Sequence, residues 1–210
     1  MPDERGDGSA RWRKGQREAV GVRIAGRGGQ GVMLSGYLLA LAGMADALHV
    51  VQTQSYGPEA RLGAAKSDVI LSRDEVAYPE VSSPDIFLCL SQDAYSAYGT
   101  GVSESSLSIL DSRVEGAPGA GSAIVVPLAA TARDGGAPFA TNIVGLGVLV
   151  AITALTSERS IREALTARIK PDSLPANLRA FDAGLALGAK AAADQLAGNG
   201  RPVFGRLRAS

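Results

Sequence analysis

The residues with the clearest chemical potential form a glycine-rich loop after the first apolar stretch of the chain. The loop consists of Gly26, Arg27, Gly28, Gly29, Gln30 and Gly31, and it satisfies the pattern G-x-G-x-x-G. An apolar strand is expected before the loop and a helix after it, and this is the context in which the pattern binds phosphate. Glycines let the backbone approach an anion closely, and the unpaired amides of a helix N-terminus point at it. The loop therefore predicts a phosphate site, with a tight strand–helix turn without a ligand as the alternative.

The stretch after the second expected strand lacks the carboxylate that a nicotinamide dinucleotide site needs. The Rossmann pattern places Asp or Glu about twenty residues beyond the glycines, where it binds the ribose. Residues 50–55 contain no carboxylate and no arginine, and Asp46 lies before the strand. This absence argues against NAD and NADP as ligands.

A second cluster of chemically capable residues leaves the carboxyl end of that strand, within 52–61. Its members are Ser55, Tyr56, Gly57, Glu59 and Arg61. Open α/β sheets bind ligands at the carboxyl ends of their strands. An aromatic ring, a carboxylate and a guanidinium at this edge can contact a phosphate or a partner chain, and an internal Glu59–Arg61 pair is the structural alternative.

Other reactive side chains are scarce. The single cysteine excludes an intramolecular disulfide, a cysteine-ligated cluster and a zinc site made by this chain alone, and the single histidine excludes a multi-histidine metal site. His49 begins a strand, so we expect a packed or interfacial side chain rather than a general base. Cys89 lies within the apolar run 86–90 and is expected to be buried.

Composition narrows the class of protein further. The chain has 210 residues with 21 Lys+Arg against 21 Asp+Glu, so its formal net charge is zero. Balanced charge argues against binding to nucleic acid or to an anionic membrane. The longest strongly apolar segment, 143–155, is too short for a membrane span of about 20 residues. With no export signal in the first twenty residues, the expected location is cytoplasmic.

The elements that must position these residues alternate between strands and helices. Strands are expected at 20–25, 48–51, 67–72, 86–90, 107–110 and 123–126, and helices at 32–45, 92–98, 142–156, 160–168 and 174–196. Asn142 and the serines at 157 and 160 are expected to mark helix starts. The fold class is α/β: a single Rossmann-like domain with a largely parallel sheet and a helical C-terminal part. We expect a disordered polar tail at 1–19, the domain at 20–197 and a second tail at 198–210.

Two motifs in tandem resemble the gamma subunit of 2-oxoacid:ferredoxin (acceptor) oxidoreductases, the pyruvate/ketoisovalerate/2-oxoglutarate oxidoreductase gamma family. They are 26–32 and 52–61, and further matches lie at 67–72, 78–79, 84–85, 142–147, 177 and 180–184. The resemblance covers about residues 20–190. One departure is Leu62, where the family has glycine after the arginine, and Leu62 adopts a positive φ poorly.

The resemblance implies a division of labour among subunits. Such complexes decarboxylate a 2-oxoacid on thiamine diphosphate with Mg, pass electrons through iron–sulfur clusters to ferredoxin, and transfer the acyl group to coenzyme A. Thiamine diphosphate and clusters are expected on alpha and beta partners, with or without a delta ferredoxin-like subunit, and the isolated chain is expected to be inactive. Coenzyme A is expected at the two motifs of this chain, and 2-oxoglutarate is the favoured substrate. The alternatives are a stand-alone dinucleotide-binding oxidoreductase and a structural subunit without a ligand.

Overall fold

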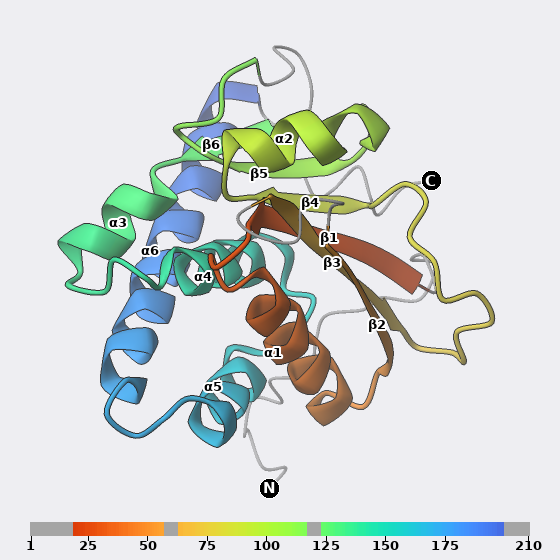
Figure 1. The fold of residues 1–210 in the computed structure, drawn as a ribbon, viewed down its shortest axis with the longest axis horizontal. Helices are drawn as coiled ribbons and strands as arrows, with labels where there is room; N and C mark the ends of the chain where they lie inside the picture. Colours follow the sequence, from red (N-terminus) through yellow and green to blue (C-terminus); the bar gives the residue numbers. More distant parts are fainter. Residues whose placement is uncertain (1–18, 57–62, 117–122, 200–210) are drawn as a thin grey trace, which may run out of the picture.

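Six strands form one sheet, in the order β2-β3-β1-β4-β5-β6 (Figure 1). A computed structural model describes residues 19–56, 63–116 and 123–199 of the chain. The strands are β1 (Ala19–Arg27), β2 (His49–Tyr56), β3 (Ala64–Ser72), β4 (Ile86–Cys89), β5 (Leu107–Asp111) and β6 (Ala123–Val126). β1, β4, β5 and β6 are parallel to one another, whereas β3 is antiparallel to both β1 and β2. The predicted α/β class with a largely parallel sheet is confirmed.

The helices divide between the two faces of the sheet, as Figure 1 shows. They are α1 (Val32–Ala45), α2 (Gln92–Tyr98), α3 (Leu128–Asp134), α4 (Thr141–Thr153), α5 (Glu158–Arg168) and α6 (Leu174–Asn199), with a short 3-10 turn at Gly99–Gly101. α1 and α3 to α6 pack with the even-numbered residues of β1 in the main core. α2 covers a smaller core on the opposite face, together with Ala25 and Phe87.

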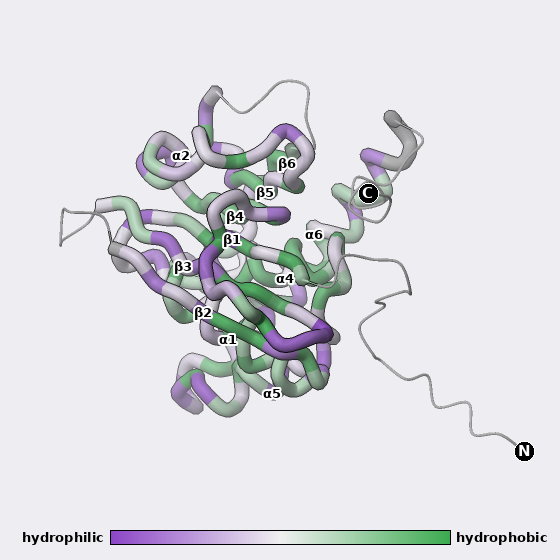
Figure 2. The backbone as a smooth tube through the Cα atoms, turned by 90° about the vertical axis from the view of Figure 1, so that its right-hand side faces the viewer, coloured by the Kyte–Doolittle hydropathy of each residue, from purple (hydrophilic) through white to green (hydrophobic). Residues whose placement is uncertain are grey.

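Burial explains why the central strands have these sequences. β4 and β5 are buried along their whole length, and the continuous apolar run of β4 is typical of a parallel strand covered on both faces. Figure 2 shows hydrophobic segments gathered where the sheet meets α4, with hydrophilic segments at the turns. No helix in the described ranges combines the length and apolar character needed to cross a membrane.

Three features differ from the sequence prediction. α3 was missed because its buried apolar residues, Leu128 and Ala132, are too few to show a helical period. β2 continues to Tyr56 although residues from Gln52 on were expected to form a loop. Asn142 does not cap α4, since Ala140 is the N-cap residue and Asn142 lies inside the helix. The expected cap at Ser157 is confirmed, because its side chain accepts a hydrogen bond from the amide of Ser160.

Candidate functional site

The glycine-rich loop connects the end of β1 to the start of α1. Gly26 and Arg27 are the last residues of β1, and Val32 is the first residue of α1. The turn closes on itself, because the Gln30 amide donates to the Arg27 carbonyl at 3.0 Å and the Gln30 side-chain oxygen accepts from the Arg27 amide at 2.6 Å. Gln30 is therefore a structural member of the loop, and its side chain is directed back at β1.

Two glycines in this loop have left-handed backbone conformations. Gly29 has φ 90° and Gly31 has φ 74°. Few residues other than glycine adopt this region without strain. The two differ in their surroundings, since a Cβ atom on Gly29 would have no heavy atom within 4 Å, whereas one on Gly31 would lie 2.5 Å from Nδ2 of Asn142. Gly29 therefore faces open space, whereas Gly31 is packed against Asn142.

The loop amides are only partly used within the chain. The Gly28 amide donates to the Gly63 carbonyl at 2.9 Å, and the Gln30 amide donates to Arg27 as described. Among the residues that the structure describes, the amides of Gly29, Gly31 and Val32 have no hydrogen-bond acceptor. These amides begin a 14-residue helix, whose N-terminus carries partial positive charge. The loop can therefore offer three donors and a favourable field to an anion.

The Gly28–Gly63 hydrogen bond also joins the two candidate stretches. Gly63 follows the motif that begins in β2, and β3 starts at the next residue. Ser55 is exposed in β2 opposite Lys66, and the Tyr56 backbone pairs with Ala65. Because Arg27 of β1 pairs with Ala64 of β3, the ends of β1 and β2 meet at one edge of the sheet. Both predicted motifs therefore reach the same edge.

Gly57, Glu59 and Arg61 lie outside the described residues, as does Leu62. The expected ligand contacts of these residues, and the alternative Glu59–Arg61 pair, stay predictions.

Arg27 is paired with a neighbouring helix. Its Nε atom donates to Oδ2 of Asp93 at 2.9 Å, and Asp93 lies in the first turn of α2. Both side chains are about half exposed, at 53% and 50%. From β1 the chain continues to β2 on one side of the sheet order, and from the neighbouring β4 it continues to β5 on the other side. The connections therefore diverge between β1 and β4, and the Arg27–Asp93 ion pair lies at this point. Ligands of open α/β sheets bind at that point.

Asn142 is a buried polar residue at the loop that sequence reasoning assigned to a different role. It is 2% exposed, and its Nδ2 atom donates to the Gly31 carbonyl at 3.1 Å and to Oγ of Ser35 at 3.0 Å. The only sequence signal is a single amide side chain near the start of a mostly apolar helix. Because Asn142 and Gly31 are 111 residues apart in the sequence, no local sequence pattern could predict their contact.

Charged side chains join β1 to β3 on the face of the sheet that α2 covers. Arg23 binds Asp68 through two hydrogen bonds, at 2.8 and 2.9 Å, and Lys66 donates to the same carboxylate at 3.0 Å. Arg23 and Asp68 are nearly buried, at 6% and 5% exposed. Burial also raises the pKa of the nearby Tyr98 phenol, whose hydroxyl donates to the Ala64 carbonyl. This network fixes the strand whose end forms the edge described above.

Cys89 and His49 have no part in this edge. Cys89 is fully buried, as predicted, and burial raises the pKa of its thiol to about 11. A thiol of that pKa is protonated and unreactive at neutral pH. His49 is exposed at the start of β2, so the expectation of a packed side chain is wrong. An interfacial role for His49 stays a prediction.

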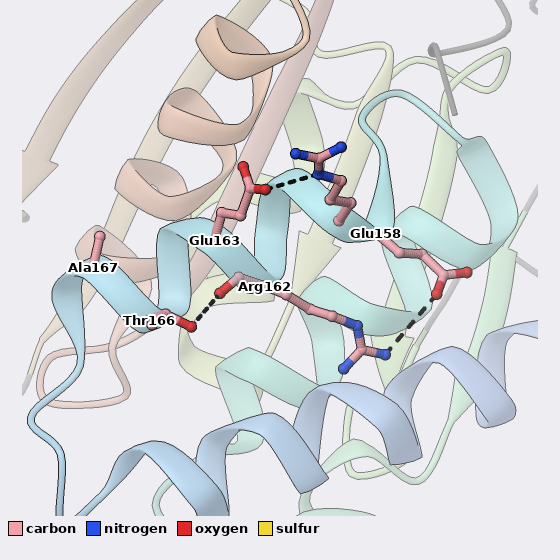
Figure 3. A pocket seen from close by; sticks show the side chains of 6 residues that line it. Glu158, Arg162, Glu163, Thr166 and Ala167 are labelled. Atoms are coloured by element: carbon pink, nitrogen blue, oxygen red, sulfur yellow. Dashed lines mark hydrogen bonds and ion pairs between the residues drawn. The ribbon is translucent and has the colours of Figure 1, made fainter. Parts of the chain in front are cut away.

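Two surface hollows formed by described residues lie away from this edge. A hollow of about 660 Å³ is lined by the outer residues of α5, and Figure 3 shows ion pairs between the side chains that line it. Its charged residues pair along the helix, with Arg159 and Glu163 at 2.8 Å. Another hollow, of about 440 Å³, lies at the opposite end of β1 and includes Tyr78, whose pKa is raised by the hydrogen bond to Glu80. Over the described ranges, no group of three or more His, Cys, Asp or Glu side chains could hold a metal ion.

Comparison with known protein families gives a match over most of the chain. The family model described as pyruvate ferredoxin/flavodoxin oxidoreductase matches residues 21–187. The 2-oxoglutarate synthase subunit KorC of Methanocaldococcus jannaschii is 36% identical over 169 residues, which cover 78% of this chain and 90% of that protein. The ketoisovalerate oxidoreductase subunit VorA of Methanothermobacter thermautotrophicus is 36% identical over 170 residues, which cover 79% of this chain and 35% of that protein.

Solved structures give the same picture. The gamma subunit of a keto/oxoacid ferredoxin oxidoreductase from Geobacter sulfurreducens has a TM-score of 0.74 and 32% identity, and the match covers 83% of this chain and 99% of that one. The 2-oxoglutarate:ferredoxin oxidoreductase from Magnetococcus marinus, solved with 2-oxoglutarate, coenzyme A and succinyl-CoA bound, has a TM-score of 0.76 at 24% identity. That match covers 83% of this chain and 32% of the other, and at this identity it shows the shared fold alone.

Proposed function

This chain belongs to the pyruvate ferredoxin/flavodoxin oxidoreductase family, and we propose that it is the gamma subunit of a complex that oxidatively decarboxylates a 2-oxoacid to its acyl-CoA. The resemblance inferred from the two motifs is confirmed by the family match and by relatives that are themselves oxidoreductase subunits. The near-complete coverage of a separate gamma subunit, at 99%, supports the assignment of the domain to residues 20–197. The expected bounds of the domain need a small correction at each end, because β1 begins at Ala19 and α6 continues to Asn199. The tails proposed at 1–19 and 198–210 otherwise lie outside the described residues.

The proposed substrate is 2-oxoglutarate. Several relatives that this chain covers almost completely are 2-oxoglutarate synthase subunits, with 88% to 93% of their length matched. The ketoisovalerate relatives match over 35% and 36% of their length, so there the similar region is one part of a longer chain. This difference in subunit organisation favours the 2-oxoglutarate branch.

Coenzyme A is the proposed ligand of the glycine-rich loop, and the residues present fit its phosphate end. The amides of Gly29, Gly31 and Val32 have no acceptor among the described residues, and the space above Gly29 is open. Arg27, a member of the loop, would contribute positive charge once its ion pair with Asp93 opens. Charge-assisted hydrogen bonds of this kind are short and strong. When bound, coenzyme A supplies the thiol that accepts the acyl group; this chain's residues would hold its distal phosphates.

Thiamine diphosphate, Mg and the iron–sulfur clusters are assigned to alpha and beta partner subunits, with or without a delta subunit, and ferredoxin is the proposed electron acceptor. The only cysteine of this chain is fully buried in the core under α2. A cluster needs accessible thiolates in a set, which one buried thiol cannot give.

The observation that carries the coenzyme A proposal is the open, left-handed Gly29 at the carboxyl edge of the sheet. Replacing Gly29 with valine should crowd the phosphate and raise the KM for coenzyme A in the assembled complex about tenfold or more. Coenzyme-A-independent decarboxylation of the 2-oxoacid should change less than about twofold, because thiamine diphosphate is bound elsewhere. A tenfold change corresponds to about 1.4 kcal/mol of binding free energy.

The control for this experiment is Gly136→Val. Gly136 also has a positive φ, 72°, and a Cβ atom there would also have no heavy atom within 4 Å. Both variants therefore place valine at a positive φ in open space, and they differ in their position in the fold. If Gly29→Val assembles normally and keeps the wild-type KM for coenzyme A, the loop is a packing element and the coenzyme A proposal is wrong.

A further inference from the structure

Asn142 joins the first turn of α4 to the loop that precedes α1. Its Nδ2 atom donates to the Gly31 carbonyl and to Oγ of Ser35, at 3.1 and 3.0 Å. Ser35 in turn donates to the Asn142 carbonyl at 3.4 Å. Asn142 is 2% exposed and Ser35 is fully buried, so the bonds between these two residues are shielded from water.

The Gly31 carbonyl is the acceptor that matters, because it receives two donors. The Ser35 amide donates to it at 3.0 Å as the first helical hydrogen bond of α1, and Asn142 provides the second donor. In a planar trans peptide the C=O and the following N–H point in opposite directions. Fixing the Gly31 carbonyl toward α4 therefore fixes the Val32 N–H toward the open side of the loop.

The contact is specific to an amide side chain beside a glycine. An aspartate at 142 would present oxygen to the oxygen of Gly31, and an aliphatic residue of similar size would leave that carbonyl with one donor fewer. A side chain on Gly31 would in turn occupy the position of Nδ2, as the 2.5 Å distance shows. Gly31 and Asn142 are thus complementary in shape and in hydrogen bonding.

We propose that Asn142 is a positioning residue for phosphate binding: it orients the Gly31–Val32 peptide so that the amides at the start of α1 face coenzyme A. This inference rests on the proposed function of the loop. It assigns to α4, from a distant part of the chain, the role of setting the geometry of the anion site. Asn142 itself does not touch the ligand.

The test is Asn142→Asp in the assembled complex, with Asn177→Asp as the matched control. Asn177 makes the same type of bond, from Nδ2 to the carbonyl of Ser173 at 2.9 Å, on α6. Asn142→Asp should raise the KM for coenzyme A about tenfold, as expected for losing a well-oriented hydrogen bond in a buried site. The kcat at saturating coenzyme A and the coenzyme-A-independent decarboxylation should stay within about twofold of wild type.

Amide hydrogen exchange of the same variants gives a readout that does not depend on the ligand. Exchange at Ser35, whose amide donates to the Gly31 carbonyl, should accelerate in Asn142→Asp and stay unchanged in Asn177→Asp. If Gly29→Val raises the KM for coenzyme A while Asn142→Asp leaves both the KM and the exchange unchanged, the positioning role is wrong and the proposed function stands. If exchange accelerates in Asn142→Asp but neither Gly29→Val nor Asn142→Asp alters the KM for coenzyme A, the loop does not bind coenzyme A. The proposed role of Asn142 in binding is then wrong as well. A uniform loss of kcat and of all activities would show that Asn142 serves folding alone.

Discussion

Replacing Gly184 with alanine should destabilise the protein, although alanine is usually more stable than glycine inside a helix. Gly184 lies in α6 where that helix crosses α4, and a Cβ atom there would overlap the carbonyl oxygen of Val144 and stand 3.0 Å from Cα of Gly147. The contact is reciprocal, because a Cβ on Gly147 would stand 2.5 Å from the carbonyl oxygen of Phe181. The two helix backbones touch, so no side chain can rotate away to make room.

The expected magnitude follows from two opposing effects. Alanine is favoured over glycine in a helix interior by about 1 kcal/mol. Overpacking a close-packed contact typically costs about 1–3 kcal/mol, and the upper end applies when backbone rather than a flexible side chain must move. The net change in unfolding free energy is therefore a loss of about 1–2 kcal/mol. Helix propensity alone predicts a gain of about 1 kcal/mol, so the two effects differ in sign.

The assay is urea or thermal unfolding of the full chain, with Gly145→Ala as the control. Gly145 lies in α4 too, but a Cβ atom there would meet only the side chain of Leu88, at 3.2 Å, and of Leu90, at 3.4 Å. Those leucine ends can shift, so the control should change stability by less than about 1 kcal/mol. Unfolding free energy equal to or above wild type in Gly184→Ala would refute the close backbone contact.

Two further outcomes are expected. Gly31→Ala should lower the free energy of unfolding by about 1–2 kcal/mol more than Gly29→Ala. Both glycines have a positive φ, but only a methyl group at position 31 would displace Asn142 from its two hydrogen bonds. Equal unfolding midpoints of the two variants would contradict this. Burial raises the pKa of the Cys89 thiol from 9.0 to about 11. Between these two pH values the unfolded chain loses the thiol proton while the folded chain keeps it. The contribution of Cys89 to the free energy of unfolding should therefore be complete below pH 9 and be lost as the pH rises toward 11. Unfolding midpoints of wild type and Cys89→Ala compared at pH 8 and pH 10.5 measure this contribution, and an identical pH dependence in the two proteins would rule it out.

The glycine-rich loop was predictable from the sequence because its determinants are local. Apolar residues before the loop, glycines within it and an apolar helix after it each act over a few positions. The capping serine at 157 was predictable for the same reason. Asn142 was not, because its partners lie 107 and 111 residues away and only the packing of α4 beside α1 brings them together.

The length of β2 was obscured by its place in the sheet. β2 is an edge strand, and its second half, Gln52–Tyr56, is polar because much of it is exposed. A polar run of that kind is typical of a loop as well as of an edge strand. The antiparallel direction of β3 follows from chain length, since parallel strands need a connection of a dozen or more residues and β2 and β3 are joined by the short segment 57–63.

The place of β3 also explains why the ribose carboxylate is missing. In the Rossmann arrangement the second strand lies directly beside the first, so an acidic residue at its end reaches the ribose of a ligand held at the glycines. Here β3 stands between β1 and β2, which puts the end of β2 about 10 Å from β1, two strand spacings away. A carboxylate at the end of β2 would not occupy the same position relative to the loop. The position beside the loop is taken by Gly63, whose carbonyl accepts the Gly28 amide. The sheet order itself therefore argues against a nicotinamide dinucleotide, and it is compatible with the proposed anion site at the amides of Gly29, Gly31 and Val32.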